Sequence, residues 1–234
     1  MVNITPFELI PYLLGKAASV GEARKLLGEI NLVNINFADE LPLSPLHWML
    51  SDNSGEAIIV EPLEDGLKIY DNPVGVLTNN PPFDKQLFYL NNYRNLSNKN
   101  PQNTFGGDFD LDEYSRGMGG LGLPGDLSSA SRFAKVAFTR ANSYSGSDEE
   151  SSVSQFFHIL ASVEQQNGCT FISDPDLFEY TIYTSCYSTN KGVLYYRTYN
   201  NSQITAIDLN KEDLDSSDLI NYNLINEQKI NFIN

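Results

Sequence analysis

A chain of 234 residues, of which 41% are hydrophobic and 19% charged, fits one large domain or two small ones and is long enough to bury a sizeable core. Its formal net charge of −15 argues against binding to nucleic acid or to an anionic membrane, because both select for lysine and arginine. Two cysteines without a CxxC spacing and only two histidines argue against a disulfide framework or a zinc site. No apolar run has the length of a membrane span and no secretory leader is recognisable, so we expect a cytoplasmic protein.

The first thirty residues predict a pair of helices. Residues 5–8, Thr-Pro-Phe-Glu, have the pattern of a capping box with proline at the first helical position, and residues 19–22 form a second box. Apolar residues follow each box at helical spacing. We expect no strand before the first helix.

Residues 43–79 contain four short β-prone runs separated by turn residues: LHWMLSD, EAIIVEP, GLKIYDN and VGVLTN. Their spacing is typical of an antiparallel meander. Turn chemistry accounts for Asn80-Pro81-Pro82, which ends the last run before a helix predicted over 83–96. It does not account for Asn79, which we place at the end of the last strand.

The second half repeats the order of helices followed by strands. A Gly- and Asn-rich loop at 98–125 is long enough to indicate function or assembly. Amphipathic helices are predicted over 128–142 and 151–165, followed by the strand-like runs FEYTIYTSCYS, KGVLYYRTYN and QITAIDL and a polar tail from residue 210. Segregated blocks of helices and strands predict an α+β fold with antiparallel sheets.

One run, GMGGLG at residues 117–122, matches the G-x-G-x-x-G pattern of dinucleotide-binding proteins. That site needs a strand before the glycines and a helix that opens directly on them. Here a polar loop precedes the run, and Leu-Pro-Gly separates it from the next helix. We therefore interpret the run as a flexible loop.

The histidines and cysteines are weak candidates for catalysis. His47 and His158 lie within apolar runs, which favours core or shell positions over a catalytic base. Cys186 lies in the middle of a predicted strand, where buried packing is the usual role. A couple between Cys186 or Cys169 and a histidine across the fold remains the alternative.

Arg132 is a stronger candidate. It lies one turn into the helix predicted over 128–142, where a cation opposes the helix dipole. Either a carboxylate such as Asp126 compensates for this, or Arg132 has a functional role. The spacing leaves both possibilities open.

Several long motifs, in the same order, resemble the choloylglycine hydrolase family. They are N-I-T-P-F-E, L-P-L-x-x-L-H-W, D-N-P-V-G-V-L-T-N-N-P-x-F, Q-L-F-x-L-N-N-Y-R-N-L-S, G-L-G-L-P-G-D-x-S-x-x-S-R-F and Q-F-F-H-I-L-x-x-V-E-Q. The resemblance extends from Asn3 to Leu209, and the family includes bile salt hydrolases and penicillin V acylases.

The resemblance implies an Ntn-hydrolase fold, an αββα sandwich of two antiparallel sheets between helical layers. It also implies hydrolysis of linear amides by an N-terminal cysteine whose own amine acts as base, with no cofactor and no metal. Asn79 matches the asparagine that donates to the oxyanion, and Arg132 matches the arginine beside the cysteine, where a cation favours the thiolate. Phe37 and Leu41 fall where family members line an apolar steroid pocket.

The start of the chain departs from the family pattern. Family members carry the cysteine, an Arg and an Asp before the N-I-T-P-F-E segment, whereas this chain begins at that segment with Met1 and Val2. We therefore expect residues 1–234 to form a single Ntn-hydrolase domain that lacks its N-terminal strands. Such a chain should be inactive by itself and poorly soluble, and release of glycine or taurine from conjugated bile acids would contradict this.

Three functions follow, and the bile salt hydrolase is favoured. The first is an amidase that cleaves glycine- or taurine-conjugated bile acids, and the second is a related penicillin V acylase. The third is a non-catalytic remnant that binds amphipathic ligands or assembles with an intact homologue. The expected partners are conjugated bile acids and further copies of the chain, since the family's loop at 96–125 contributes to a homotetramer; nucleic acid and membrane are not expected.

Overall fold

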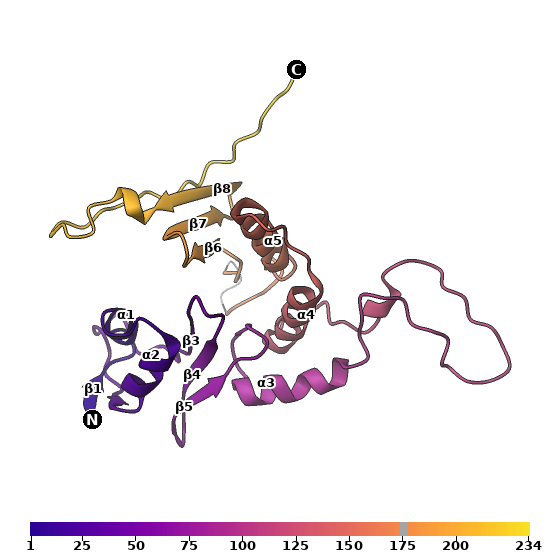
Figure 1. Cartoon of the computed structure of the whole chain (residues 1–234), viewed down its shortest axis with the longest axis horizontal. Helices are drawn as coiled ribbons and strands as arrows, with labels where there is room; N and C mark the ends of the chain where they lie inside the picture. The colour runs from indigo at the N-terminus through magenta and orange to yellow at the C-terminus, as the bar shows by residue number, and fades with distance from the viewer. Residues whose placement is uncertain (174–176) are drawn as a thin grey trace. The chain divides into compact units, whose positions relative to one another are not determined.

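The computed structural model describes residues 1–173 and 177–234. The chain forms two compact units, Met1–Asn92 (the N-terminal unit) and Tyr93–Asn234 (the C-terminal unit). Figure 1 shows the helices and strands of both units. The assignment of residues 1–234 to a single domain stays a prediction.

The N-terminal unit begins with a strand. β1 (Val2–Ile4) pairs in parallel with β2 (Ile30–Leu32), and the helices α1 (Leu9–Leu14) and α2 (Val20–Leu27) lie between them in the chain. The helix pair is therefore confirmed, but the expectation that no strand precedes it is wrong. A strand of three residues is too short to show a period of its own, and its pairing partner is distant in the sequence.

Both predicted capping boxes form hydrogen bonds. The Ser19 hydroxyl accepts the N–H of Glu22 at 3.2 Å and caps α2. The Glu8 carboxylate accepts the N–H of Thr5 at 3.0 Å and its hydroxyl at 2.6 Å, one turn ahead of α1. The second box thus marks the start of α2, whereas α1 starts at Leu9, after the first box, and not at the proline as predicted.

The predicted meander contains three strands. β3 (Trp48–Ser51), β4 (Ala57–Leu63) and β5 (Gly66–Asp71) form an antiparallel sheet in that order. α3 (Phe83–Tyr89) follows it and continues as a short 3-10 helix, Leu90–Tyr93. The meander and the helix are confirmed.

The fourth β-prone run, residues 74–77, does not form a strand. The side chain of Asn72 takes the place of a neighbouring strand: its Nδ2 donates to the Val76 carbonyl at 3.1 Å, and its Oδ1 accepts the Gly75 N–H at 2.8 Å. Gly75 has a φ of 61°, which favours glycine. Asn79 therefore lies in a bend and not at the end of a strand, which corrects the prediction.

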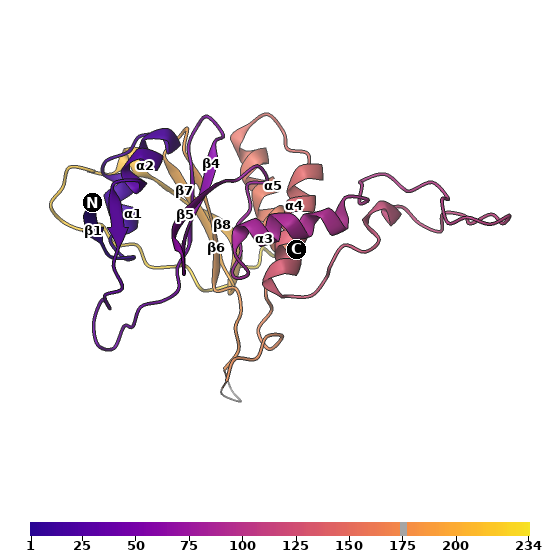
Figure 2. The ribbon, with the colours of Figure 1, turned by 90° about the horizontal axis from the view of Figure 1, so that it is seen from below.

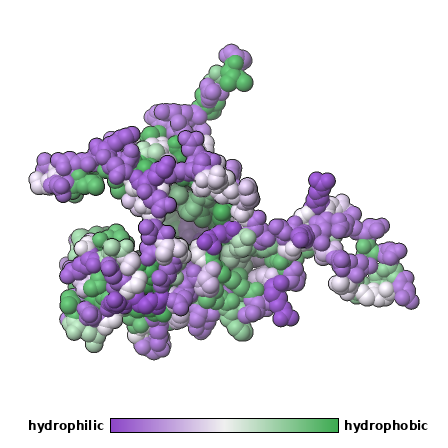
Figure 3. Space-filling model, in the orientation of Figure 1, coloured by the Kyte–Doolittle hydropathy of each residue, from purple (hydrophilic) through white to green (hydrophobic). Residues whose placement is uncertain are grey.

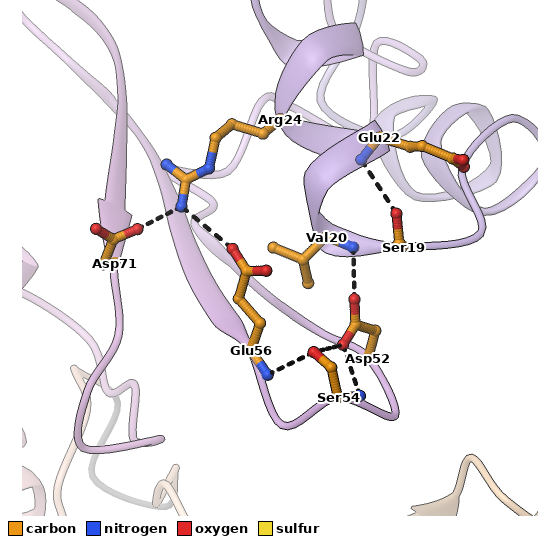
Figure 4. A network of polar contacts seen from close by, with 8 residues as sticks. All are labelled: Ser19, Val20, Glu22, Arg24, Asp52, Ser54, Glu56 and Asp71. Atoms are coloured by element: carbon orange, nitrogen blue, oxygen red, sulfur yellow. Dashed lines mark hydrogen bonds and ion pairs between the residues drawn. The ribbon is translucent and has the colours of Figure 1, made fainter.

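Polar contacts fasten α2 to the sheet (Figure 4). An oxygen of Asp52 accepts the N–H of Val20 at 2.8 Å, and Arg24 forms ion pairs with Asp71 and, at 3.8 Å, with Glu56. Beneath these contacts lies the apolar core, which consists of Ile4, Leu9, Leu13, Val20, Ala23, Leu27, Ile30, Trp48, Ile58 and Val60. The core joins both helices to the strands of this unit.

The C-terminal unit carries a second antiparallel sheet. Its elements are a 3-10 turn (Met118–Gly120), α4 (Ser129–Asn142), α5 (Glu149–Ala161), β6 (Tyr183–Ser188), β7 (Val193–Thr198), β8 (Asn201–Asp208) and a final 3-10 turn (Leu209–Lys211). The sheet order is β6-β7-β8, and its strands lie in the three predicted strand-like runs. The loop before α4 extends away from α4 and α5 in both Figure 1 and Figure 2.

Side-chain contacts hold α5 against the sheet. Glu149, in its first turn, accepts the hydroxyl of Tyr195 at 2.7 Å and pairs with Lys191 at 3.3 Å. Beyond its last turn, Glu164 pairs with Arg197 of β7. Both ends of α5 are therefore fixed to the same sheet.

The C-terminal tail lies along the turn between β7 and β8 before it extends outward. The carbonyls of Ile225 and Glu227 accept hydrogen bonds from Thr198 and Asn201, both at 2.8 Å. Figure 3 shows apolar residues at the end of the tail.

Apart from the parallel pair β1–β2, blocks of helices and antiparallel sheets alternate along the chain, which confirms the α+β class.

Candidate active site

Asn79 is held through its backbone. Its side chain is exposed, and its carbonyl accepts a hydrogen bond from Nε2 of Gln86 at 2.6 Å. The same Nε2 donates to the Pro81 carbonyl at 2.7 Å, and the hydroxyl of Thr78 donates to Oε1 of Gln86 at 2.7 Å. Gln86 is only 1% exposed, so a buried amide group in α3 organises the turn that carries Asn79.

A buried carboxylate fixes the next residues of this turn. Glu61 of β4 is 3% exposed and accepts the N–H of Phe83, the first residue of α3, at 3.0 Å. His47 lies 3.9 Å from the other oxygen of Glu61 and is partly buried, which confirms a shell position for this histidine. Neither Glu61 nor Gln86 was a candidate from the sequence. An acidic residue inside the apolar run EAIIVEP was the available signal for Glu61.

Arg132 lies in the first turn of α4, in the C-terminal unit. Its Nε donates to the Leu127 carbonyl at 3.0 Å. Burial lowers the pKa of Arg132, and the negative charge of Glu179 opposes that shift. The guanidinium group is therefore partly desolvated, which strengthens its field on any neighbouring group.

Asp126 caps the same helix. Its carboxylate accepts the N–H of Ser128 at 2.9 Å and the hydroxyl of Ser131 at 2.6 Å. Hydrogen bonds from Ser128 and Ser131 lower the pKa of Asp126 to about 2. The sequence left open whether Asp126 compensates Arg132. In the structure the serines occupy both Asp126 oxygens, and Glu179 is the carboxylate whose charge raises the pKa of Arg132.

Phe37 and Leu41 lie on the surface of the N-terminal unit. Phe37 is 67% exposed and packs edge-on against Phe7, with ring centroids 5.0 Å apart. Leu41 is 57% exposed and closes a tight turn through its N–H, which donates to the Ala38 carbonyl at 3.1 Å. The structure therefore places two predicted pocket residues on one short exposed segment of the unit that also contains Asn79.

Both thiols are internal to the chain. Cys186 lies in β6 opposite Tyr195, and burial, aided by the negative charge of Glu149, raises the pKa of its thiol. A raised pKa keeps the thiol protonated and therefore a weak nucleophile. Cys169 is exposed. His158 is also exposed, on α5, so its expected position in the apolar core or shell is wrong: it projects from the outer face of the amphipathic helix.

The glycine run at 117–122 is explained by close backbone packing. A Cβ on Gly119 would overlap the carbonyl oxygens of Ser97 and Lys99, and the Gly119 carbonyl accepts the Ser97 N–H at 3.0 Å. Gly117 has a φ of 84°, a conformation that favours glycine. Two glycines of the run thus serve the packing of the loop around the 3-10 turn Met118–Gly120, while the predicted flexibility of this loop stays a prediction.

A cavity of about 420 Å³ lies in the C-terminal unit. Its described lining comes from β7, β8 and the tail: Tyr196, Thr205, Ala206, Ile207, Asp208, Lys211, Glu212, Tyr222, Asn223 and Ile225. Within residues 1–173 and 177–234, no cluster of three or more histidine, cysteine or acidic side chains is arranged to hold a metal ion. None of the helices in these ranges has the length and apolar character needed to cross a membrane.

Comparison with known proteins identifies the family. Residues 1–222 match the family of linear amide C–N hydrolases called the choloylglycine hydrolase family. The chain belongs to this family, and the resemblance inferred from the sequence motifs is confirmed.

Two relatives are named bile salt hydrolase/transferase. The protein from Lactiplantibacillus plantarum is 64% identical over 215 residues, which cover 92% of this chain and 66% of the relative. The protein from Clostridium perfringens is 38% identical over 233 residues, which cover 99% of this chain and 70% of the relative. The chain thus spans about two thirds of the length of these relatives.

Solved structures give the same fold. A variant of the conjugated bile acid hydrolase from Clostridium perfringens matches 100% of this chain with a TM-score of 0.90 and 38% identity, over 71% of its own length. Penicillin V acylase from Agrobacterium tumefaciens matches 91% of this chain with a TM-score of 0.70 and 20% identity, over 58% of its own length, which shows a shared fold alone. The predicted Ntn-hydrolase fold class is confirmed by these matches.

Proposed function

We propose that the protein acts as a bile salt hydrolase and cleaves the amide bond of glycine- or taurine-conjugated bile acids. The observation that carries this proposal is the 64% identity over 92% of the chain to a bile salt hydrolase/transferase. Identity at this level preserves the fold and generally the side chains around a reacting group. The structural match to a conjugated bile acid hydrolase supports the same substrate class.

In this reaction Asn79 stabilises the oxyanion. Attack on the amide carbon places negative charge on the carbonyl oxygen, and a fixed N–H donor lowers the free energy of that state. Asn79 presents an exposed side chain on a backbone that Gln86 holds by a hydrogen bond of 2.6 Å. A donor carried on a held backbone needs less reorganisation when the charge develops, which supports this role.

Arg132 favours the thiolate form of the nucleophile. Its burial and its bond to the Leu127 carbonyl keep the guanidinium group in one place. A cation at short range lowers the pKa of a thiol and raises the fraction of reactive thiolate. The nucleophile in this proposal is the N-terminal cysteine of the family, because the half-buried Cys186 has a raised pKa.

Phe37 and Leu41 contact the steroid. A bile acid presents a large apolar surface, and transfer of that surface from water onto apolar side chains favours binding. Phe37 and Leu41 are both more than half exposed, on one short segment beside Phe7. Substitution of either by serine should therefore raise KM more than it lowers kcat.

We also propose a homotetramer in the cytoplasm, with the loop at 96–125 as one assembly surface. Large aromatic side chains support an interface there, since Phe105 is 78% exposed and Tyr114 is 77% exposed. Analytical ultracentrifugation tests the assembly, and cell fractionation tests the location.

The test of the reaction measures release of glycine and taurine. It uses the chain itself and the chain supplemented with the part of the Lactiplantibacillus plantarum relative that the match leaves out. Glycocholate, taurocholate and penicillin V are offered at equal concentration. Release of glycine or taurine by the supplemented form, faster than penicillin V cleavage, is the expected result, and release by the chain itself would contradict its expected inactivity. Faster cleavage of penicillin V would establish the acylase. If neither form cleaves any of the three substrates, the protein is non-catalytic.

A further inference from the structure

The amide group of Gln86 forms three hydrogen bonds within the protein. Its Nε2 donates to the carbonyls of Asn79 and Pro81 at 2.6 and 2.7 Å, and its Oε1 accepts the hydroxyl of Thr78 at 2.7 Å. Three bonds from one side chain thus reach residues on both sides of the Asn79–Asn80 peptide. With 1% exposure, Gln86 has no access to bulk water that could replace these bonds.

The orientation of this amide group is fixed by chemistry. Backbone carbonyls only accept hydrogen bonds, so the NH₂ group of Gln86 has to face Asn79 and Pro81. The oxygen of the amide then faces Thr78, which can donate through its hydroxyl. A hydroxyl can donate or accept, so the two carbonyls set the orientation of the Gln86 amide and Thr78 adds a bond that helps to hold it.

The chain on both sides of Asn79 is held in the same way. Before it, the side chain of Asn72 bonds to Gly75 and Val76, and after it, the Glu61 carboxylate accepts the N–H of Phe83. These bonds come from side chains and replace the ladder bonds that a strand would provide. The position of Asn79 therefore depends on buried polar side chains, of which Glu61 comes from a distant part of the chain.

We propose that Gln86 is a positioning residue for the reaction: it holds the backbone of Asn79 so that the Asn79 amide meets the oxyanion. This inference rests on the proposed function of Asn79. A shift of a catalytic donor by about 1 Å costs on the order of 10²-fold in rate, so loss of the hydrogen bond to the Asn79 carbonyl has a measurable effect on turnover.

A double-mutant cycle separates positioning from simple stability. Gln86→Met keeps the size of the side chain and removes all three hydrogen bonds. In the active form found by the hydrolysis assay, we expect Gln86→Met to lower kcat by about tenfold or more with KM within about twofold. In the Asn79→Ala background the same substitution should change kcat by less than about twofold, because the donor that it positions is already absent. The melting temperature should fall equally in both backgrounds.

Two further variants keep the test interpretable. Thr78→Val removes only the hydroxyl that bonds to the amide oxygen, so it should still fold if Gln86→Met fails to fold. It should lower kcat when Asn79 is present and change kcat little in the Asn79→Ala background. Lys85→Met, on the exposed neighbouring position of α3, is the matched control and should leave kcat unchanged. An NMR measurement complements the cycle. The side-chain NH₂ resonance of Asn79 is assigned by its loss in Asn79→Asp. This resonance should shift in Gln86→Met and should not shift in Lys85→Met.

The outcomes distinguish the two proposals. If Asn79→Ala lowers kcat but the Gln86 and Thr78 substitutions lower only the melting temperature, Gln86 is structural and the positioning role is overturned. Equal effects of Gln86→Met on kcat in both backgrounds would overturn it too. If Asn79→Ala leaves kcat unchanged, the proposed role of Asn79 fails and the positioning role fails with it.

Discussion

Asn79 and Arg132 are held in place by different means. Asn79 lies in an irregular bend, and a neutral buried amide, Gln86, anchors its backbone. Arg132 lies on a regular helix, where its own Nε bonds to Leu127 and the charged carboxylate of Asp126 caps the first turn. One position depends on a buried side chain that reaches back from the next helix, and the other depends on the geometry and charge of its own helix.

This difference determines how each position responds to change. Hydrogen bonds between neutral groups do not titrate, so the hold of Gln86 on the Asn79 carbonyl should not depend directly on pH. The cap on α4 depends on an ionised Asp126, so its contribution to stability should disappear in acid. Substitutions and pH can therefore test the two regions independently.

The largest effect is expected at Asn79 itself. Asn79→Ala should lower kcat by about 10²–10³-fold, the usual result of removing an oxyanion donor, with little change in the melting temperature. Hydrolysis of glycocholate by the active form measures kcat, and calorimetry measures the melting temperature. Asn80→Ala, at the exposed neighbouring position, is the control. A fall in melting temperature without a fall in kcat would show that Asn79 only serves the turn.

Substitution of Arg132 should give the next largest effect and should also change the pH dependence of kcat/KM. Arg132→Met removes the cation, so the apparent pKa of the nucleophile in the kcat/KM profile should rise by about 1–3 units. The rate near neutral pH should fall accordingly, and Arg132→Lys should restore part of it because the charge returns without the planar donor geometry. Arg140→Met, in the last turn of the same helix, should leave the profile in place. An unshifted profile in Arg132→Met would show that Arg132 does not act through its charge.

Glu61 tests the anchoring of the bend at the level of stability. Glu61→Leu leaves the buried N–H of Phe83 without its acceptor, which should lower the free energy of unfolding by about 1–3 kcal/mol. Glu61→Gln retains an acceptor oxygen and should cost less. Urea unfolding provides the measurement, with Glu64→Leu at an exposed position as control. Equal losses in Glu61→Leu and in the control would show that this bond adds nothing to the bend.

The smallest effect is a dependence of stability on pH at Asp126. The pKa of Asp126 is lowered from 3.8 to about 2 in the folded chain. The ionised carboxylate therefore makes its full contribution to stability above the pKa of the unfolded chain. That contribution should be lost as the pH falls from about 4 to about 2. Asp126→Asn and Ser131→Ala should both reduce the slope of the unfolding free energy against pH. Ser154→Ala, on the exposed face of α5, should leave this slope unchanged. A slope unchanged in Asp126→Asn would show that the serine bonds do not persist in solution.

Much of the secondary structure could be predicted because it depends on local sequence. The capping box at Ser19 and Glu22, the turn residues between β3, β4 and β5, and the apolar spacing of α4 each act within a few residues. The same holds for Arg132, whose position on α4 follows from helical spacing.

The sequence by itself determined the family, through long motifs in a fixed order, and with it the candidate residues Asn79, Arg132, Phe37 and Leu41. The tertiary structure alone decided that β1 pairs with β2, that residues 74–77 form no strand, and that His158 is exposed. It also decided that Gln86 and Glu61 support the bend at Asn79. The physical reason is that a buried polar side chain bonds to whichever backbone groups the fold brings beside it, and no local pattern records that choice.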